Sequence, residues 1–295
     1  MNLIAIFQKY PDHKSCIEHL EKVRWGDKPI CPHCGSEYVA RKSENDIIGR
    51  WNCHSCRSSY NVLSGTIFQQ TKQPLQKWFL AISLVLNAKK SLSSYQLARD
   101  LNMNQKTAWL MASKIRKQMG KDSVGMLQGI IEADECYIGG KPRKTHRHAD
   151  KKPNKRGRGT KKQAVIGVVE RGGKVKAEPV KNTTSNTLSA FISESIDKVG
   201  SILITDEYKG YRAVQATMPC AVINHKRQYT DGLIHTNTIE EFWALLKRAW
   251  YGSHHHYQTK YAHRYITESC YKYNSRWRKT VDVRCRFRSA CVRPP

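Results

Sequence analysis

Two matched cysteine pairs constrain the fold of this 295-residue chain more than any other feature of its sequence. Cys31 and Cys34 stand in "CPHCG", and Cys53 and Cys56 stand in "WNCHSC" after eighteen intervening residues. Two thiolates at this spacing can reach the same tetrahedral zinc ion, and four of them leave no coordination position open for water. The pattern therefore predicts a structural zinc ribbon made of two short hairpins that meet at one ion.

Two other interpretations of these cysteines stay open. His33 and His54 lie inside the two pairs and could each replace a thiolate as a ligand. The pairs could also be unrelated reduced thiols. The N-terminal stretch "MNLIAIFQKYPDHKSC" lacks a basic n-region and a small-residue cleavage site, so we expect a docked strand or helix there and not a signal peptide. The ten cysteines are therefore expected in a reducing cytoplasm.

The charge of the chain indicates a polyanionic partner. Lysine and arginine number 51 against 24 acidic residues, which gives a formal net charge of +27. Such an excess destabilises a compact chain through self-repulsion, and a bound polyanion relieves that repulsion. Nucleic acid is the leading expectation. A membrane surface is a weaker one, because the sequence has no apolar run close to the roughly 20 residues that a span requires.

The segment that follows the ribbon, residues 67–122, reads as helical. An apolar run begins after Pro74, a second helix follows a capping Ser93 or Ser94, and a third is amphipathic, basic and ended by Gly120. Two short helices around a tight turn suggest a helix-turn-helix, whose second helix would enter the major groove of double-stranded DNA. An ordinary packed helical hairpin is the alternative. The expected DNA contacts are Lys106, Thr107, Lys114, Arg116 and Lys117.

From residue 123 onward the pattern changes to strands that alternate with helices. Strands are expected at 129–140, twice within 162–180, at 201–211 and at 220–224, with helices at 185–200 and 237–252. A meander of three strands followed by this alternation implies a mixed sheet with helices on its faces. The expected fold class is α+β and multidomain: a segment with the zinc ribbon (1–66), a helix-turn-helix-like segment (67–122), a catalytic domain (123–276) with a basic loop (141–162), and an irregular basic tail (277–295).

Three acids in the second half of the chain could share metal ions. Asp134 lies within the first of these strands, with Glu132 on the same face and Glu135 on the opposite one. Asp206 ends another apolar strand, and Glu240 lies on the last helix. Carboxylate oxygens suit Mg²⁺ or Mn²⁺, and a pair of such ions supports in-line phosphoryl transfer. The alternative is that the two aspartates are strand-end caps or ion-pair partners.

Two further polar residues share the helix face of Glu240. Lys247 follows seven residues later, two helical turns and roughly 10 Å along the axis, where a cation could grip a phosphate of the DNA being cut. Asn237 precedes Glu240 by one turn and could add an amide ligand.

Longer stretches of the chain resemble a known family. They are the cysteine pairs followed by "SGTIFQQTKQPLQKWF", then "EADECYIGGK", "ITDEYKGY" and "HTNTIEEFWALLKRAWYGSHHHYQTKYAHRYITESCYKYNSR". Through them, residues 15–276 resemble bacterial insertion-sequence transposases of the DDE class, in the branch with an N-terminal zinc ribbon (the IS-fifteen-ninety-five type). The resemblance implies an RNase H-like catalytic core.

The resemblance also implies roles for individual residues. Asp134 and Asp206 would be the two catalytic aspartates, and Glu240 would be the third acid, with Lys247 after it. In this branch of the family, the asparagine at the position of Asn237 is also considered as the third metal ligand. Glu240 is preferred, because a carboxylate neutralises the charge of Mg²⁺ and an amide does not. Glu135 and Glu241 are the alternative acids.

The reaction implied by the resemblance is cleavage of DNA at the terminal inverted repeats of a mobile element. Water would hydrolyse a phosphodiester, and the freed 3′-hydroxyl would then attack target DNA without a covalent enzyme intermediate. The ribbon and the helical segment would recognise the ends, with phosphate contacts supplying affinity and base contacts supplying register. A homodimer or larger assembly on paired ends is expected, in the bacterial cytoplasm and associated with the nucleoid.

Two remaining stretches bear on activity. Arg248, and His255 and His256 in "YGSHHHYQ", are expected to touch DNA phosphates. The tail at 277–295 departs from the family, since it is rich in arginine and has no helical period, as in a degenerate copy or readthrough in another frame. The competing hypothesis is therefore a DNA-binding protein with a zinc ribbon and a helix-turn-helix but no catalysis, or an inactive transposase copy.

Overall fold

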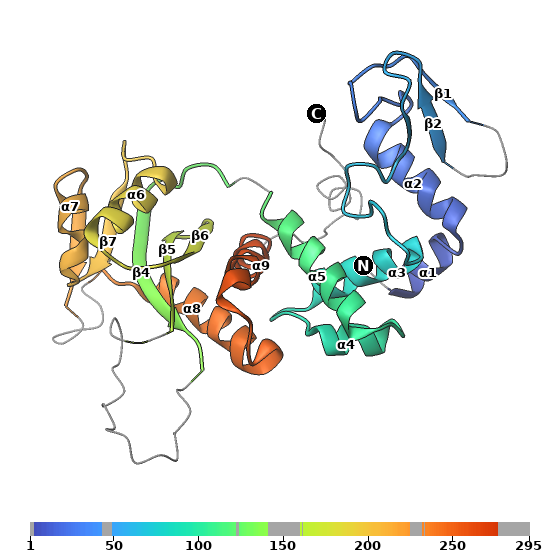
Figure 1. The fold of residues 1–295 in the computed structure, drawn as a ribbon. Coiled ribbons are helices and arrows are strands. Elements are labelled where there is room, and N and C mark those ends of the chain that lie inside the picture. The colour runs from blue at the N-terminus through green and yellow to red at the C-terminus, as the bar shows by residue number, and fades with distance from the viewer. Residues whose placement is uncertain are drawn as a thin grey trace, which may run out of the picture. The chain divides into compact units, whose positions relative to one another are not determined.

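The computed structural model describes residues 3–42, 49–121, 124–140, 160, 162–224, 232 and 234–276 of the chain. The chain divides between Asp122 and Ser123 into two compact units, here the N-terminal and the C-terminal unit. Figure 1 labels their helices and strands. Within the described ranges, no helix is both long enough and apolar enough to cross a membrane. Most of the expected basic loop and the whole tail at 277–295 lie outside the described residues.

The N-terminal unit joins a small antiparallel sheet, in the order β1-β2-β3, to a set of helices. The stretch at the N-terminus, expected as a strand or a helix, forms helices, and the expected helices over residues 75–120 are present. The elements are α1 Leu3–Lys9, α2 His13–Trp25, β1 Val39–Arg41, β2 Arg50–Cys53, β3 Ser59–Asn61, α3 Leu75–Asn87, α4 Ser94–Asp100 and α5 Gln105–Met119.

Helix α2 fastens the small sheet to the helices. The Glu21 carboxylate on α2 accepts hydrogen bonds from Arg41 Nη2 on β1 at 2.5 Å and from Trp51 Nε1 on β2 at 2.8 Å. Arg24, one turn later, donates to the carbonyl oxygens of Val62 and Ser64 at 2.6 and 2.7 Å. These bonds hold α2 to the sheet, and Gln76 Nε2 on α3 donates to the Tyr10 carbonyl oxygen at 2.6 Å. The ribbon and the helical segment therefore belong to one compact unit.

The pair α4 and α5 forms the expected two helices around a tight turn. The side chain of Ser93 caps α4 by accepting from Gln96 N, and the side chain of Asn104 caps α5 by accepting from Lys106 N. These caps satisfy amide groups that the first turn of a helix leaves without partners. Helix α5 ends at Gly120, as expected.

The C-terminal unit is built on a five-stranded mixed sheet in the order β6-β5-β4-β7-β8. Strands β4, β5 and β6 form an antiparallel meander, while β7 and β8 run parallel to β4, which confirms the expected mixed sheet. The elements are β4 Ile130–Ile138, β5 Gln163–Glu170, β6 Val175–Val180, α6 Ser185–Ser195, β7 Ile202–Asp206, η3 Lys209–Tyr211, α7 Arg212–Gln215, β8 Cys220–Ile223, α8 Asn237–Ala249, η4 Trp250–His254, η5 Thr259–Tyr261 and α9 Ala262–Asn274.

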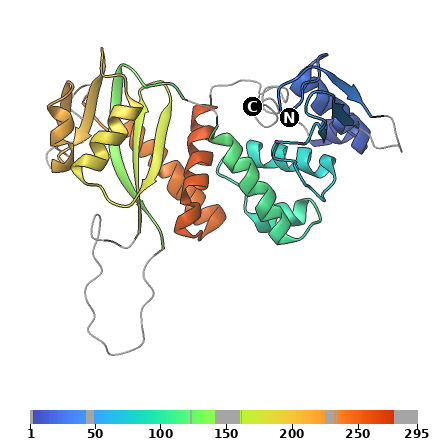
Figure 2. The same ribbon diagram turned by 45° about the horizontal axis from the view of Figure 1, so that its top comes forward.

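Helices cover both faces of this sheet (Figure 2). One apolar cluster joins Ile131 and Ala133 of β4 to α6 and α7, and a second joins Cys136 and Ile138 of β4 to α8 and α9. Successive residues of a strand point to opposite faces, so the even-numbered residues of β4 all face α8. Asp134 therefore shares its face with Glu132, and Glu135 lies on the opposite face, as the sequence predicts.

Candidate catalytic centre and metal site

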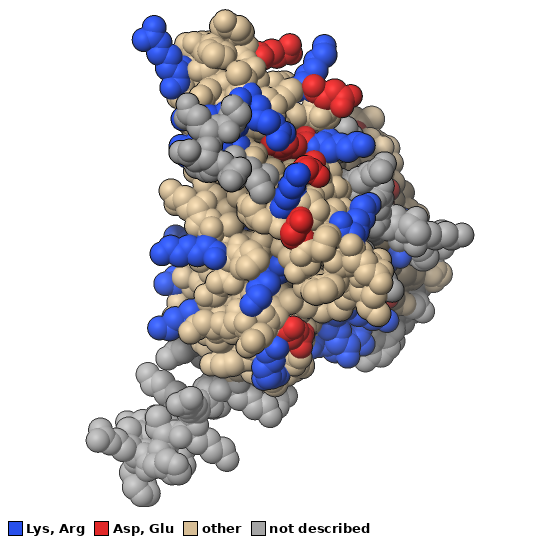
Figure 3. Space-filling view, turned by 90° about the vertical axis from the view of Figure 1, so that its right-hand side faces the viewer, with Lys and Arg blue, Asp and Glu red and all other residues tan. Residues whose placement is uncertain are grey.

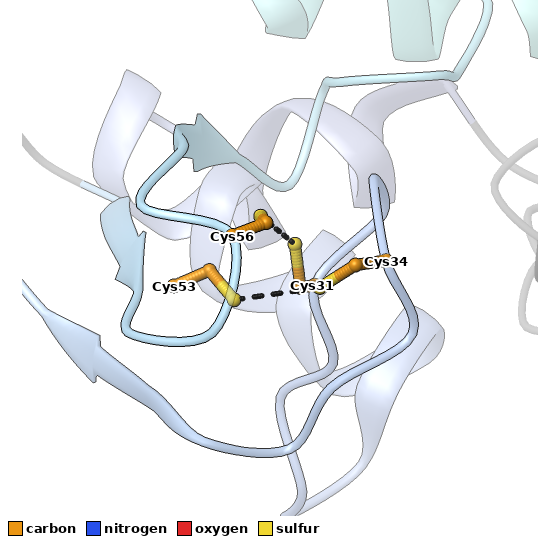
Figure 4. Close-up of side chains that lie close together, drawn as sticks. All are labelled: Cys31, Cys34, Cys53 and Cys56. Carbon is orange, nitrogen blue, oxygen red and sulfur yellow. Dashed lines mark hydrogen bonds between the residues drawn. The ribbon is translucent and has the colours of Figure 1, made fainter.

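The four expected cysteines converge on one point in the N-terminal unit (Figure 4). The Sγ atoms of Cys31 and Cys56 lie 3.7 Å apart, those of Cys34 and Cys53 lie 3.5 Å apart, and all four lie within 4.8 Å of one another. Tetrahedral zinc with Zn–S bonds of about 2.3 Å places its sulfur ligands roughly 3.8 Å apart. The donor set therefore fits a structural zinc ion.

The two histidines that lie within the cysteine pairs each pack against a tyrosine ring. The His33 ring lies against Tyr60 with ring centroids 6.4 Å apart, and the His54 ring lies against Tyr38 at 4.7 Å. Two of the cysteines, Cys31 and Cys53, are buried beside Tyr60 in the small core of the ribbon. The four-thiolate interpretation is therefore favoured over a site in which histidine replaces cysteine.

In the C-terminal unit, the pairing of β4 with β7 brings the two predicted catalytic aspartates to the same level. The two strands are parallel, and Ile130 pairs with Ile202 and Glu132 with Ile204. The same offset of 72 residues separates Asp134 from Asp206. The two carboxyl groups therefore lie on neighbouring strands and on the sheet face that α8 covers, and the charge of Asp206 acts on Asp134.

Asp134 accepts two hydrogen bonds, and its surroundings raise its pKa. Trp243 Nε1 on α8 donates to Asp134 Oδ2 at 3.0 Å, and the backbone N–H of Glu135 donates to Oδ1 at 2.7 Å. Burial raises the pKa of Asp134 to about 7, and the negative charges of Glu135 and Asp206 raise it as well. Both effects disfavour an ionised carboxylate without a counter-ion, and a bound cation would relieve them.

Helix α8 runs beside β4 with a matched spacing. Four residues along a helix rise about 6 Å, and two residues along a strand span about 6.6 Å. Ile239 N and Trp243 Nε1, four residues apart on α8, therefore meet Glu132 and Asp134, two residues apart on β4. One helical step further on, Lys247 lies beside the thiol of Cys136. Burial raises the pKa of this thiol to about 11, and the charge of Lys247 offsets part of that rise.

Glu240, the third predicted acid, lies on the part of α8 that faces solvent and not on the part that packs against β4. Glu240, Asn237 and Lys247 are exposed residues of α8, and Thr236 Oγ1 donates to Glu240 Oε1 at 3.4 Å. In the described part of the chain, the four cysteines are the one set of three or more Cys, His, Asp or Glu side chains whose ligand atoms gather closely enough for a metal ion. Glu240 does not join the two aspartates in such a set.

The two alternative acids have other neighbours. Tyr211 Oη, fully buried on the opposite face of the sheet, donates to Glu135 Oε2 at 3.1 Å. Glu241 is exposed on α8, and its charge acts on Tyr273 of α9. Glu135 thus faces away from the side of β4 that carries Asp134, which favours Asp134 over Glu135 as the candidate metal ligand of β4.

The role of Trp243 beside Asp134 was not identified from the sequence. Its position three residues after Glu240 and four before Lys247 puts it on their side of α8, and this spacing is the signal that was available. Gly167 of β5, which pairs with Asp134, makes room for the indole ring. A Cβ atom at Gly167 would lie 2.6 Å from Trp243 Cη2, closer than carbon atoms can pack.

Substitution of Gly167 by alanine is therefore expected to push Trp243 away from Asp134. Trp243 is only 3% exposed, so the ring has little space in which to move, and overpacking of this kind costs about 1–3 kcal/mol. Urea unfolding of Gly167→Ala should show a loss of this size. Gly125→Ala, where a Cβ atom meets nothing within 4 Å, is the matched control. Equal stability of the two variants would contradict the packing described.

The predicted DNA contacts on α5 fall into two groups. Lys106 and Lys117 are exposed and Thr107 is partly exposed, so all three are accessible to a ligand. Lys114 is half-buried, and its Nζ donates to the Ile67 carbonyl oxygen at 3.1 Å.

The structure corrects the prediction for Arg116. This side chain is 1% exposed, and its Nη2 donates to the Leu92 carbonyl oxygen at 3.0 Å. Arg116 is thus an interior residue that satisfies a backbone group before α4 and cannot contact DNA. The sequence pattern failed here because an arginine near the end of an amphipathic basic helix was assumed to face solvent.

The other expected phosphate contacts follow Lys247. Arg248 is exposed at the end of α8, and His255 and His256 are exposed just after η4. The backbone of His255 has a φ of 54°, and its N–H donates to the Trp250 carbonyl oxygen at 2.7 Å, which closes the turn. Figure 3 shows lysine and arginine side chains spread over one face of the molecule with acidic side chains between them.

Comparisons with known protein families match both units. The ISXO2-like transposase domain matches residues 126–274, and the transposase zinc-ribbon domain matches residues 11–59, which contain all four converging cysteines. The matches and the mixed sheet define the class of protein as a transposase of the DDE type with an N-terminal zinc ribbon. The first match spans just over half of the 295 residues, and the chain belongs to the ISXO2-like transposase domain family.

One sequence relative agrees with this assignment. An uncharacterized protein in transposable element ISH50 of Halobacterium salinarum is 26% identical over 245 residues, which cover 80% of this chain and 82% of that protein. The Mos1 transposase paired-end complex with left transposon end shares 13% identity and a TM-score of 0.26, covering 72% of this chain and 80% of that one. The Mos1 Strand Transfer Complex shares 12% identity and a TM-score of 0.25, covering 72% and 79%. TM-scores this low support no argument about the site.

Proposed function

We propose that this transposase cleaves double-stranded DNA at the terminal inverted repeats of its element and joins the ends to target DNA, with divalent cations held by Asp134, Asp206 and Glu240. The observation that carries the proposal is the placement of Asp134 beside Asp206 on one covered sheet face, with the pKa of Asp134 raised to about 7. A donor set of carboxylate oxygens suits Mg²⁺ or Mn²⁺.

Each residue of the centre has a proposed task. When bound, a pair of such ions activates the attacking oxygen and stabilises the leaving oxygen during phosphoryl transfer. Asp134 is oriented for ligation by the hydrogen bond from Trp243, and Asp206 ends its strand beside it. Glu240 supplies the third carboxylate from α8, with Asn237 as the alternative ligand. Lys247 binds a phosphate of the strand being cut.

The basic residues outside the centre are proposed to hold the DNA. Lys106, Thr107 and Lys117 on α5, together with the zinc ribbon, would recognise the transposon ends, while Arg248, His255 and His256 would contact phosphates near the scissile bond. A net charge of +27 supports strong, salt-dependent affinity for the phosphate backbone. We further propose action in the bacterial cytoplasm on nucleoid DNA, by a homodimer or larger assembly that pairs two ends.

A cleavage assay with matched variants tests this function. Full-length protein is incubated with Mg²⁺ or Mn²⁺ and duplexes that carry the terminal repeats of the element, and products are resolved on denaturing gels. The wild type and Asp197→Ala, which removes an acid outside the centre, should release a 3′-hydroxyl end, whereas Asp206→Ala should give no product. DNA binding without cleavage by the wild type in either metal would instead identify a DNA-binding protein without catalysis.

The perturbed carboxyl group predicts how metal binding depends on pH. Because Asp134 is protonated below a pKa of about 7 and must be ionised to bind a cation, Mn²⁺ affinity should fall about tenfold for each pH unit below 7. Electron paramagnetic resonance of free Mn²⁺ between pH 5.5 and 8.5 measures this fall in the zinc-loaded protein. Asp134→Asn should bind weakly without that pH dependence. A wild-type affinity that stays constant from pH 8 to 6 would contradict the assignment.

A further inference from the structure

Among the described acids of the C-terminal unit, Glu132 is the most buried; it lies two residues before Asp134 on β4 and faces α8. Its side chain is completely buried. Its Oε1 accepts from Arg171 Nε at 2.6 Å and from Thr238 Oγ1 at 2.9 Å, and its Oε2 accepts from the Ile239 backbone N–H at 2.9 Å. The Nδ1 atom of His235 lies 3.4 Å from Oε1.

The contacts with His235, Thr238 and Ile239 lie at the beginning of α8. The residue that precedes the helix, Thr236, makes no side-chain capping hydrogen bond to the helix backbone. Glu132 therefore does the work of a helix cap from a strand more than one hundred residues away, and its negative charge also lies at the positive end of the helix dipole.

Arg171 completes the arrangement from a second direction. It lies in the turn between β5 and β6, where its backbone N–H donates to the Ile130 carbonyl oxygen at 3.0 Å. Its guanidinium bonds Glu132 and, through Nη2, donates to the His235 carbonyl oxygen at 2.8 Å. The Glu132–Arg171 pair thus ties the segment that leads into α8 to two strands of the sheet.

A buried ion pair needs a reason, because an apolar pair of similar volume is often as stabilising. Here Glu132 joins β4, the strand that carries Asp134, to the first turn of α8, which carries Glu240. Glu240 directly follows Ile239, whose backbone N–H donates to Glu132. We infer that the Glu132–Arg171 pair is a positioning element, which fixes the first turn of α8 so that Glu240 can act together with Asp134 on the same metal centre. The inference rests on the proposed function for the role of Glu240.

Thr238 offers a substitution that weakens this tie without removing a buried charge. Thr238→Val loses the hydroxyl that donates to Glu132 and keeps the shape of the side chain, while Thr238→Ser keeps the hydroxyl. Thr187→Val is the matched control, since Thr187 Oγ1 donates to Asn182 Oδ1 at 2.8 Å in the first turn of another helix, α6. Glu132→Gln is a second test, because its amide cannot accept the Ile239 N–H and the Arg171 and Thr238 donors together.

Two measurements on the zinc-loaded, full-length protein decide the inference. Hydrogen exchange without divalent ions should be at least about tenfold faster in the first turn of α8 in Thr238→Val, the usual effect of losing a hydrogen bond to a charged group, and unchanged in Thr187→Val. The Mn²⁺ concentration for half-saturation should rise about three- to tenfold in Thr238→Val and return close to the wild-type value in Thr238→Ser.

The outcomes separate this inference from the proposed function. If the wild type binds Mn²⁺ and Thr238→Val and Glu132→Gln bind it equally well, the positioning role is wrong and the proposed function stands. If only the hydrogen exchange changes, the ion pair merely stabilises α8, and the positioning role is likewise wrong. If the wild type binds no Mn²⁺ outside the zinc ribbon, both the inference and the proposed function are wrong.

Discussion

Replacement of Asp134 by asparagine is expected to reduce DNA cleavage by at least about a thousandfold, equivalent to about 4 kcal/mol in the activation barrier. The substitution keeps the volume of the side chain and removes the charge that would hold a cation beside Asp206. Single-turnover cleavage of a duplex with the terminal repeats, in Mg²⁺ and in Mn²⁺, measures the loss.

The same variant carries its own control for folding. The pKa of Asp134 is raised in the folded protein to about 7, above the ordinary value of 3.8, so ionisation of this group costs stability that increases as the pH rises from about 4 to about 7. Without divalent ions at pH 8, Asp134→Asn should therefore melt at a higher temperature than the wild type. A variant that loses cleavage and also melts lower would point to misfolding and not to loss of a ligand.

Removal of zinc is expected to unfold the ribbon. Its strands are three or four residues long, and its core of buried residues consists of Cys31, Cys53 and Tyr60, which is too little apolar surface to hold the sheet together. Binding of structural zinc to small domains contributes about 10–16 kcal/mol, so the sheet depends on the ion. Chelation or Cys31→Ser should abolish hydrogen-exchange protection in β1, β2 and β3.

Loss of the ribbon should also weaken binding to the transposon ends, which a filter-binding assay at fixed salt measures. Cys16→Ala is the control, because Cys16 is buried in α2 of the same unit and lies outside the cluster of four thiols. The zinc content should be one ion per chain in Cys16→Ala and in the wild type. Unchanged protection of the strands after complete chelation would show that the four thiols are not a structural metal site.

Much of the fold could be predicted from local signals. Pro74 marks the start of α3, Ser93 caps α4, and Gly120 marks the end of α5. These signals are visible because capping and tight turns depend on residues within a few positions of one another. Helix α9 was not identified as an element, since aromatic residues at helical intervals are common in any buried segment.

The contacts across the site could not be predicted in the same way. Glu132 bonds residues 39, 106 and 107 positions away, and no periodic pattern reports which distant side chain will meet a buried carboxylate. The prediction that Glu132 shares the face of Asp134 was correct, but no sequence pattern separates a structural acid from one proposed to bind a metal ion. The solvent exposure of the side chains distinguishes the two kinds of acid. Glu132 is buried and surrounded by hydrogen-bond donors, whereas Asp134 and Asp206 are partly exposed.

The proposed catalytic centre requires side chains distant in sequence to gather around divalent cations. A crystal structure of the protein with Mn²⁺ and a duplex transposon end, with manganese located by anomalous scattering, tests it most directly. We expect manganese within about 2.2 Å of carboxylate oxygens from Asp134, Asp206 and Glu240. Manganese bound by Glu135 or Glu241 instead, or a well-ordered DNA complex in which Asp134 and Asp206 hold no ion in common, would contradict it.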